Sequence, residues 1–160
     1  MKVLYDNQIF MMQKIGGISR YFVELMKNSN YLFEYSVSLK YSDNLYLKDL
    51  NLFKPLICNK YFKGKGFLTN QINNLYQNRM LSKLNFDILH PTYFNPNIIK
   101  KLPSEKKLVL TVYDMIYEIF PNLFNDANKI QEWKKEMLYK SDKIIAISDC
   151  TKKRYFKILS

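Results

Sequence analysis

The sequence has few of the residues that build metal centres and disulfide frameworks. Its two cysteines, Cys58 and Cys150, lie far apart, and neither a CxxC pair nor a Cys/His cluster occurs. A disulfide scaffold and a zinc site are therefore not indicated, and this cysteine usage is typical of a reducing cytoplasm. We expect no metal.

Long apolar runs are missing as well. The chain starts with a single lysine and the short strand-like run KVLYD, which lacks the apolar region of a signal peptide. No segment approaches the roughly 18 consecutive apolar residues that span a bilayer. The interpretation is a cytoplasmic protein that is at most peripheral to the inner face of the plasma membrane.

Glycine is scarce, with four residues in the chain. Neither GxGxxG nor GxxxxGK[ST] occurs, which argues against a dinucleotide-binding fingerprint and a P-loop. Gly16 and Gly17 are adjacent, and their backbone NH groups can approach a phosphate at the start of the helix that follows. A simple tight turn is the alternative explanation of this pair.

The charge is strongly positive: 25 Lys and Arg against 14 Asp and Glu give a net charge of +11. Such a charge attracts polyanions and anionic lipid. Nucleic acid is not expected as a partner, because zinc spacing, an aromatic RNA-binding strand and an Arg-rich run are all missing. The segment 54–65 mixes Lys with apolar residues, which suits an anionic membrane surface; a solvated loop is the alternative.

Length and periodicity predict one α/β domain over residues 1–160. Residues 8–15 and most of 41–62 are expected to be loops. Alternating strands and helices predict a Rossmann-like, doubly wound, mostly parallel sheet with helices on both faces. Strands are expected at 2–5, 35–39, 86–90, 107–112 and 143–147, and helices at 18–28, 67–84, 128–139 and after Ser148. The helix at 67–84 is expected to bury one apolar face made of Phe67, Ile72, Leu75, Tyr76, Met80 and Leu84.

Ligands of such sheets bind outside the carboxyl ends of the strands. His90, the only histidine, ends a predicted strand there and is either a ligand contact or a structural residue. Ser148 either touches the cleft or caps its helix. Arg20 is expected to pair with Glu24, four residues further along the helix, or to lie on a solvated face, with a phosphate contact as the alternative. The segments expected at this edge are 6–17, 90–95, 113–118 and 148–151.

A family resemblance rests on four segments in series: QKIGGISRYFVELMK, FDILHPTYFNP, LVLTVYDMIYEIFP and SDKIIAISDCTKK. In this order they resemble the N-terminal domain of retaining GT-B glycosyltransferases of the bacterial polysaccharide and lipopolysaccharide type, glycosyltransferase family 4. The resemblance implies transfer of a sugar from a nucleotide-sugar donor to a glycan or lipid-linked glycan acceptor. It implies no cofactor, because positive groups and helix dipoles neutralise the leaving diphosphate without an obligatory metal.

The resemblance also implies roles for single residues. Gly16 and Gly17 would lie against the donor diphosphate, and Ser148 matches the family's I-A-x-S motif. Tyr113 and Asp114 stand where the family often has His-Asp. A tyrosine hydroxyl donates a hydrogen bond but does not carry protons near neutral pH. Asp114 would orient an acceptor hydroxyl or act as a base, with a loop cap as the alternative. His90 would contact the acceptor, so Tyr113, Asp114 and His90 form the expected catalytic group.

The donor-binding C-terminal domain of the family has no counterpart in these 160 residues. We therefore expect the chain to be inactive alone, because the donor phosphate must be held from both sides. The chain would then be a fragment, the product of a truncated reading frame, or one half of a split transferase. A non-catalytic binding or interaction domain is the alternative function. The sugar, the linkage and the acceptor are not legible from the residues.

Overall fold

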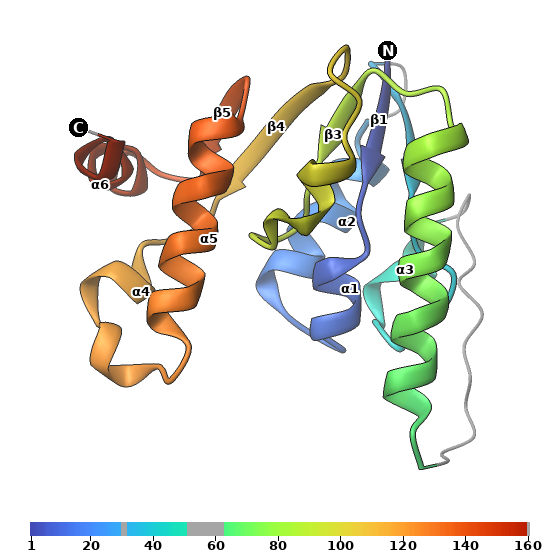
Figure 1. Ribbon diagram of the computed structural model, residues 1–160, viewed down its shortest axis with the longest axis horizontal. Coiled ribbons are helices and arrows are strands. Elements are labelled where there is room, and N and C mark those ends of the chain that lie inside the picture. Colours follow the sequence, from blue (N-terminus) through green and yellow to red (C-terminus); the bar gives the residue numbers. More distant parts are fainter. Residues whose placement is uncertain (30–31, 51–62, 160) are drawn as a thin grey trace.

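A single parallel sheet forms the centre of the fold. The computed structural model describes residues 1–29, 32–50 and 63–159. Five strands pair in the order β2-β1-β3-β4-β5, and every pairing is parallel (Figure 1). The strands are β1 (Lys2–Tyr5), β2 (Glu34–Val37), β3 (Ile88–His90), β4 (Lys107–Val112) and β5 (Lys143–Ala146). The predicted Rossmann-like α/β fold is confirmed.

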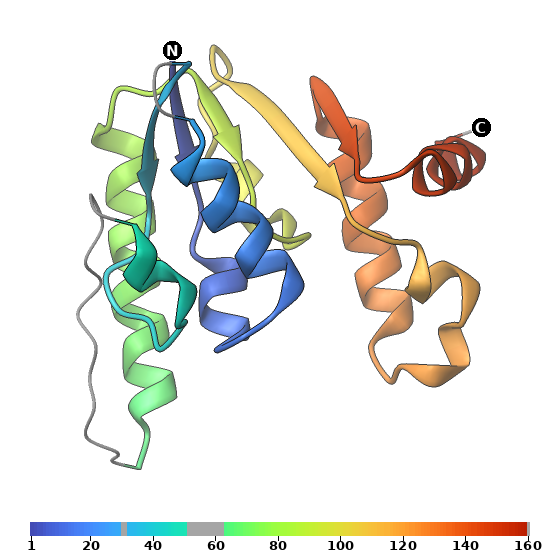
Figure 2. The ribbon, with the colours of Figure 1, turned by 180° about the vertical axis from the view of Figure 1, so that it is seen from behind.

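Helices cover the sheet from both sides. The helices are α1 (Gln8–Met12), α2 (Gly17–Lys27), α3 (Lys65–Lys83), α4 (Ile116–Ile119), α5 (Ala127–Lys140) and α6 (Asp149–Leu159). In Figure 1, α3 and α5 lie in front of the sheet, and the view from behind in Figure 2 shows α2 on the opposite face. Right-handed crossovers between parallel strands produce this arrangement.

The buried apolar side chains form two core clusters. Leu4, Leu89 and Leu108 pack with Leu81 of α3 on one face. Side chains at adjacent positions point to the opposite face, where Tyr5 packs with Phe22 of α2. Both faces are apolar because each carries a layer of helices, which explains the continuous apolar run in β4.

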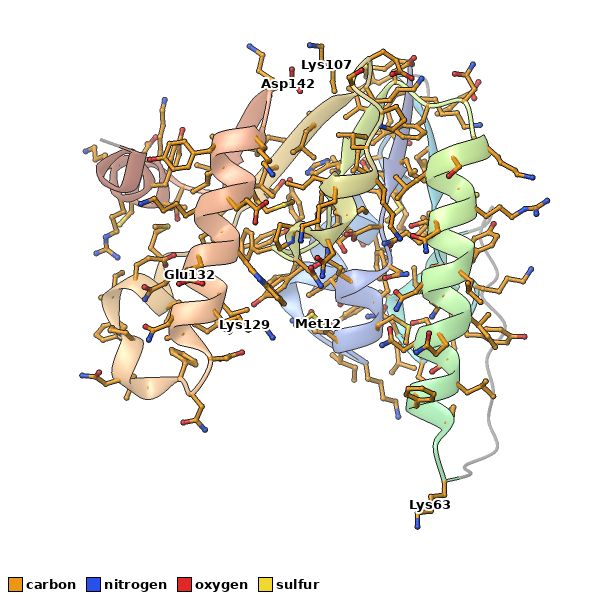
Figure 3. The ribbon with its side chains drawn as sticks, viewed as in Figure 1. Met12, Lys63, Lys107, Lys129, Glu132 and Asp142 are labelled. Carbon is orange, nitrogen blue, oxygen red and sulfur yellow. The ribbon has the colours of Figure 1, made fainter. Side chains whose placement is uncertain are left out.

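The amino ends of β4 and β5 are joined by polar side chains. Asp142 accepts a hydrogen bond from Leu108 N at 2.8 Å and forms an ion pair with Lys107, whose Nζ lies 2.9 Å from the carboxylate. Figure 3 labels this pair at the edge opposite the strand carboxyl ends. These contacts, the backbone bond first, lower the pKa of the Asp142 carboxyl. These contacts hold the amino ends of β4 and β5 together at the edge of the sheet opposite the strand carboxyl ends.

Two expected loops contain helical turns. Residues 8–12 form the helix α1, which is stabilised because two of its own side chains, Ile9 and Phe10, are buried in the core. The predicted loop 41–62 includes the 3-10 turn η1 (Tyr46–Asp49), and two further 3-10 turns are η2 (Pro96–Lys101) and η3 (Pro121–Leu123). Of the basic segment 54–65, residues 54–62 lie outside the described part of the chain. Its proposed membrane contact is therefore not described.

The predicted apolar face of α3 is confirmed in part: Met80 and Leu84 pack against the core cluster that contains Leu81, and Ile72 and Tyr76 are half-buried. Phe67 and Leu75 are 72 % and 69 % exposed, whereas the buried residues of this helix are Asn73 and Leu81. Asn73 Oδ1 accepts hydrogen bonds from Lys40 N at 2.8 Å and Tyr41 N at 2.9 Å, and its Nδ2 donates to Tyr41 O. A polar anchor therefore fixes this helix alongside its apolar contacts.

Among the described helices, none combines the length and the apolar character needed to cross a membrane.

Replacing Asn73 with Ala should lower the free energy of unfolding by about 2 kcal/mol, because two backbone NH groups lose their acceptor. Urea denaturation followed by circular dichroism measures the change. Gln71→Ala, at an exposed position of the same helix, is the matched control and should shift the value by less than about 0.5 kcal/mol. Equal effects of the two substitutions would contradict the anchoring role of Asn73.

Candidate functional site

The strand order shows where two connections leave neighbouring strands and run toward opposite sides of the sheet. β2 lies on one side of β1, whereas β3, β4 and β5 lie on the other. The loops after β1 and β3 therefore diverge at the carboxyl edge, and such switch points are where open α/β sheets bind ligands. Asp6 follows β1 and Thr92 follows β3 at this place.

Asp6 connects these two loops. Its fully buried carboxylate accepts a hydrogen bond from Thr92 N at 2.9 Å, together with short bonds from the Thr92 hydroxyl and Gln8 Nε2. The Thr92 hydroxyl oxygen in turn accepts from Ile9 N at 3.0 Å. Burial raises the pKa of Asp6 above its usual value, against the lowering effect of these hydrogen bonds. The carboxylate is thus a structural link with no exposed surface to offer a ligand.

His90 lies beneath the surface. Its side chain is 4 % exposed, and Nε2 is 2.8 Å from Thr111 Oγ1. The imidazole also packs against the rings of Tyr5 and Phe22. Burial lowers its pKa from 6.5 to about 4. A ligand contact at this position would require the neighbouring rings to move, so the arrangement corresponds to the structural alternative.

Tyr113 and Asp114 differ sharply in exposure. Tyr113 is 7 % exposed, and its hydroxyl donates to Thr92 O at 3.1 Å. Burial raises its pKa well above the usual value. Asp114 is exposed and accepts a hydrogen bond from Ile116 N at 3.1 Å. Asp114 therefore closes an Asx turn and keeps a charged carboxylate at the surface, whereas the Tyr113 hydroxyl is already occupied.

A buried lysine holds the Asp114 loop against α5. Lys134 is 1 % exposed, and its Nζ lies 3.0 Å from Glu118 Oε2 and 3.1 Å from Asp114 O. The ammonium group also lies over the ring of Phe94, 5.0 Å from the centroid. Sequence reasoning missed this residue, because a lysine within a helix is usually solvated.

The two candidate glycines have different surroundings. The Gln13 side chain covers Gly16, where an added Cβ would lie 2.2 Å from Gln13 Oε1. This oxygen also accepts from Ser19 N at 3.3 Å, so the protein itself satisfies one NH group of the first turn of α2. Gly17 is exposed, and nothing lies within 4 Å of an added Cβ. Of the pair, Gly17 is the one open to a ligand.

Ser148 caps α6. Its hydroxyl oxygen accepts from Thr151 N at 3.1 Å, which is the geometry of an N-cap. Thr151 Oγ1 lies 3.4 Å from Tyr113 O, so the cap is linked to the loop after β4. The structural alternative for Ser148 is therefore present, next to the predicted edge.

Of the two preferred roles of Arg20, the ion pair with Glu24 is not formed, and the side chain lies on a solvated face. Glu24 instead pairs with Lys27 at 3.2 Å, and Arg20 is exposed. Both cations are within reach of Glu24 along one helix, and the lysine toward the carboxyl end of α2 also complements the helix dipole.

One hollow beside this edge was not singled out by sequence reasoning, although the predicted segments 6–17 and 90–95 contribute to its wall. A cavity of about 660 Å³ lies beside the switch point, between α1, α3, η2 and α5. Met12 of α1 and Lys129 of α5, both labelled in Figure 3, come from two of its walls. None of the predicted site residues lines it. A signal was present in the sequence: Asn70, Asn74, Gln77 and Asn78 recur at the spacing of one helical face.

Within the described ranges, no three His, Cys, Asp or Glu side chains are grouped closely enough to hold a metal ion. No protein-family model matches the chain, and neither a curated protein nor a solved structure shows significant similarity to it. The family resemblance of the four segments therefore stays a prediction.

The buried neutral His90 should make the protein sensitive to mild acid. The folded-state pKa of His90 is about 4 and its unfolded value is 6.5. The contribution of the neutral imidazole to the free energy of unfolding is therefore complete above pH 6.5 and is lost as the pH falls toward 4. Between about pH 7 and pH 4, wild type should lose about 3 kcal/mol of unfolding free energy relative to His90→Gln. Urea denaturation across this range measures the difference. Parallel pH profiles of the two proteins would refute the assignment.

Removing Lys134 should leave Glu118 without its partner. Lys134→Ala should lower the free energy of unfolding by about 3 kcal/mol, as expected for breaking a buried ion pair. Lys135→Ala, at the exposed neighbouring position, is the control and should cost less than about 0.5 kcal/mol. Thermal denaturation of both variants decides, and similar losses would show that Lys134 does not hold this loop.

Proposed function

We propose that this chain is the acceptor-side domain of a GT-B-type glycosyltransferase. In the proposed reaction, a sugar moves from a nucleoside diphosphate to the hydroxyl of a glycan or lipid-linked glycan, with retention of configuration. The bond from the anomeric carbon to the diphosphate breaks and the nucleoside diphosphate leaves with its electron pair, while a bond to the acceptor oxygen forms and the acceptor's proton passes to the carboxylate of Asp114. The setting would be the synthesis of cell-surface polysaccharide or lipopolysaccharide on the cytoplasmic side of the membrane.

One observation carries the proposal. The segments of the family resemblance lie on one parallel sheet, so the residues after β1, β3, β4 and β5 meet at a single edge. Gly17, Asp114 and Ser148 come from three of these connections. Any all-parallel sheet brings its strand ends together in this way, which makes a shared binding site possible, and the four family-like motifs on these connections carry the assignment to a transferase.

Gly17 is the residue best suited to the donor diphosphate. It is the first residue of α2, an 11-residue helix, and it is exposed. A helix start offers backbone NH groups and a partial positive charge, both of which favour the negative charge that develops on a leaving diphosphate. Because Gln13 covers Gly16, we assign this role to Gly17 and the residue after it.

Asp114 is the residue best suited to an acceptor hydroxyl. Its exposed carboxylate follows β4 and is oriented by the bond from Ile116 N. Tyr113 acts indirectly in this proposal: its hydroxyl donates to Thr92 O and so fixes the start of the loop that carries Asp114. The net charge of +11 supports an approach to lipid-linked acceptors at an anionic membrane.

The donor site can be tested on the 160-residue chain by NMR titration with UDP, GDP and ADP. At least one of the three should shift the amide signals of Gly17 and Ile18. Gly17→Asp should weaken this binding by about fivefold or more, because a carboxylate at the start of α2 repels the diphosphate. Without a donor-binding partner domain, we expect binding without sugar transfer.

The matched control is Gly66→Asp. Gly66 also has open space around an added Cβ, but it belongs to α3 and not to the first turn of α2. This control should bind as wild type does. The proposed donor contact fails if none of the three nucleotides moves the Gly17 signal, or if both glycine variants bind equally well.

A further inference from the structure

The cavity beside the switch point has a wall of unusual composition. Asn and Gln make up 21 of the 160 residues of the chain, yet they are eight of the 18 residues that line this cavity. They come from α1, α3 and the segment around η2, so the enrichment arises from the tertiary arrangement of three separate segments. An apolar or purely ionic ligand would not need such a wall.

Several of these amides have an NH2 group left to donate. Asn78 and Asn97 accept hydrogen bonds from lysine ammonium groups, and Gln77 accepts one from Asn7 N. These partners can only donate, so they fix the amide oxygens toward the protein and leave the NH2 groups for other acceptors. The wall therefore presents an excess of donors.

Three further amides on the wall are unused. The Asn7 side chain is 4 % exposed, and its Nδ2 has no hydrogen-bond partner. Asn70 and Asn74 are exposed residues of α3, and neither side chain bonds to another described residue. Buried donors without a partner are rare in folded proteins, and here one lies beside the hollow that a ligand would fill.

Lysines add positive charge at the rim. Lys100, Lys101 and Lys129 line the cavity, and none of them forms an ion pair with a carboxylate among the described residues. Asp126 is the one acidic residue among the lining residues. The ligand that fits is therefore rich in acceptor oxygens and carries a negative group.

Aromatic rings complete the wall. Tyr93 and the half-buried Trp133 both line the cavity, and Lys129 Nζ lies 4.4 Å from the Trp133 ring centroid. Aromatic faces pack against the CH groups of a sugar ring, whereas amides match hydroxyls that both donate and accept. Together with the lysines, this combination selects a charged saccharide over a simple anion.

We propose that this cavity binds an anionic saccharide, with a phosphorylated hexose as the simplest example. Hydroxyls would bond to the amides of α3 and Asn7, the ring would pack against Trp133, and the phosphate would lie near Lys129. The site is separate from the proposed donor contact, because neither Gly17 nor Asp114 lines it. The inference therefore does not rest on the transferase function.

Trp133 is the only tryptophan in the chain, so its fluorescence reports on this cavity directly. The full chain is titrated with glucose 1-phosphate, galactose 1-phosphate, mannose 1-phosphate and N-acetylglucosamine 1-phosphate, with the four parent sugars and with inorganic phosphate. At least one sugar phosphate should bind about tenfold more tightly than its parent sugar and than phosphate, as expected when charge and hydroxyl contacts act together. Calorimetry on the same pairs provides an independent affinity.

Variants then locate the site. Asn74→Ala and Lys129→Gln should each weaken binding by about fivefold or more. Gln71→Ala, an exposed position of α3 that does not line the cavity, should bind as wild type does. Gly17→Asp should also leave this binding unchanged, which separates a failure here from a failure of the donor contact.

Three results would overturn the proposal: none of the four sugar phosphates binds, inorganic phosphate binds as tightly as every sugar phosphate, or Asn74→Ala and Lys129→Gln both bind like Gln71→Ala. The second result would mean a general anion site and the third a site elsewhere on the protein.

Discussion

The buried carboxylate of Asp6 links the two strands on which the carboxyl edge depends. It follows β1 and accepts hydrogen bonds from the backbone and hydroxyl of Thr92, which follows β3. These strands are neighbours in the sheet, and their connections diverge at this point. A hydrogen-bonded carboxylate with no solvent exposure is costly to rearrange. The residues at which the loops after β1 and β3 begin are therefore held in place.

Two different surfaces are built outward from this link. Along the connections after β1, β3 and β4, Gly17 and Asp114 stay exposed, whereas Tyr113 and His90 are buried. On the face covered by α3, the amide-lined cavity adjoins Gln8, which also bonds to Asp6. The same carboxylate therefore supports a region suited to a diphosphate and a cavity suited to a charged saccharide.

The strands were the most predictable part of the fold. The apolar run 107–112 coincides with β4, because a strand covered on both faces leaves a continuous hydrophobic signal. α3 was located, and Met80 and Leu84 of its predicted face pack against the core. Asn73 was missed, because it anchors the helix by hydrogen bonds that periodicity does not reveal. α1 was missed because its five residues are too few to show a helical period.

The sequence by itself determined the α/β class and which segments follow the strands, because local hydrophobic patterns specify strands and helices. It also supplied the residue types of the candidate site. Only the tertiary structure decided which of them a ligand can reach. His90 and Tyr113 are covered by side chains from other elements, whereas Asp114 and Gly17 are open. Gly16 is covered by Gln13, a near neighbour in the sequence. The cavity appeared only when α1, α3, η2 and α5 came together. Burial and convergence depend on contacts between residues distant in sequence, and no local pattern encodes them.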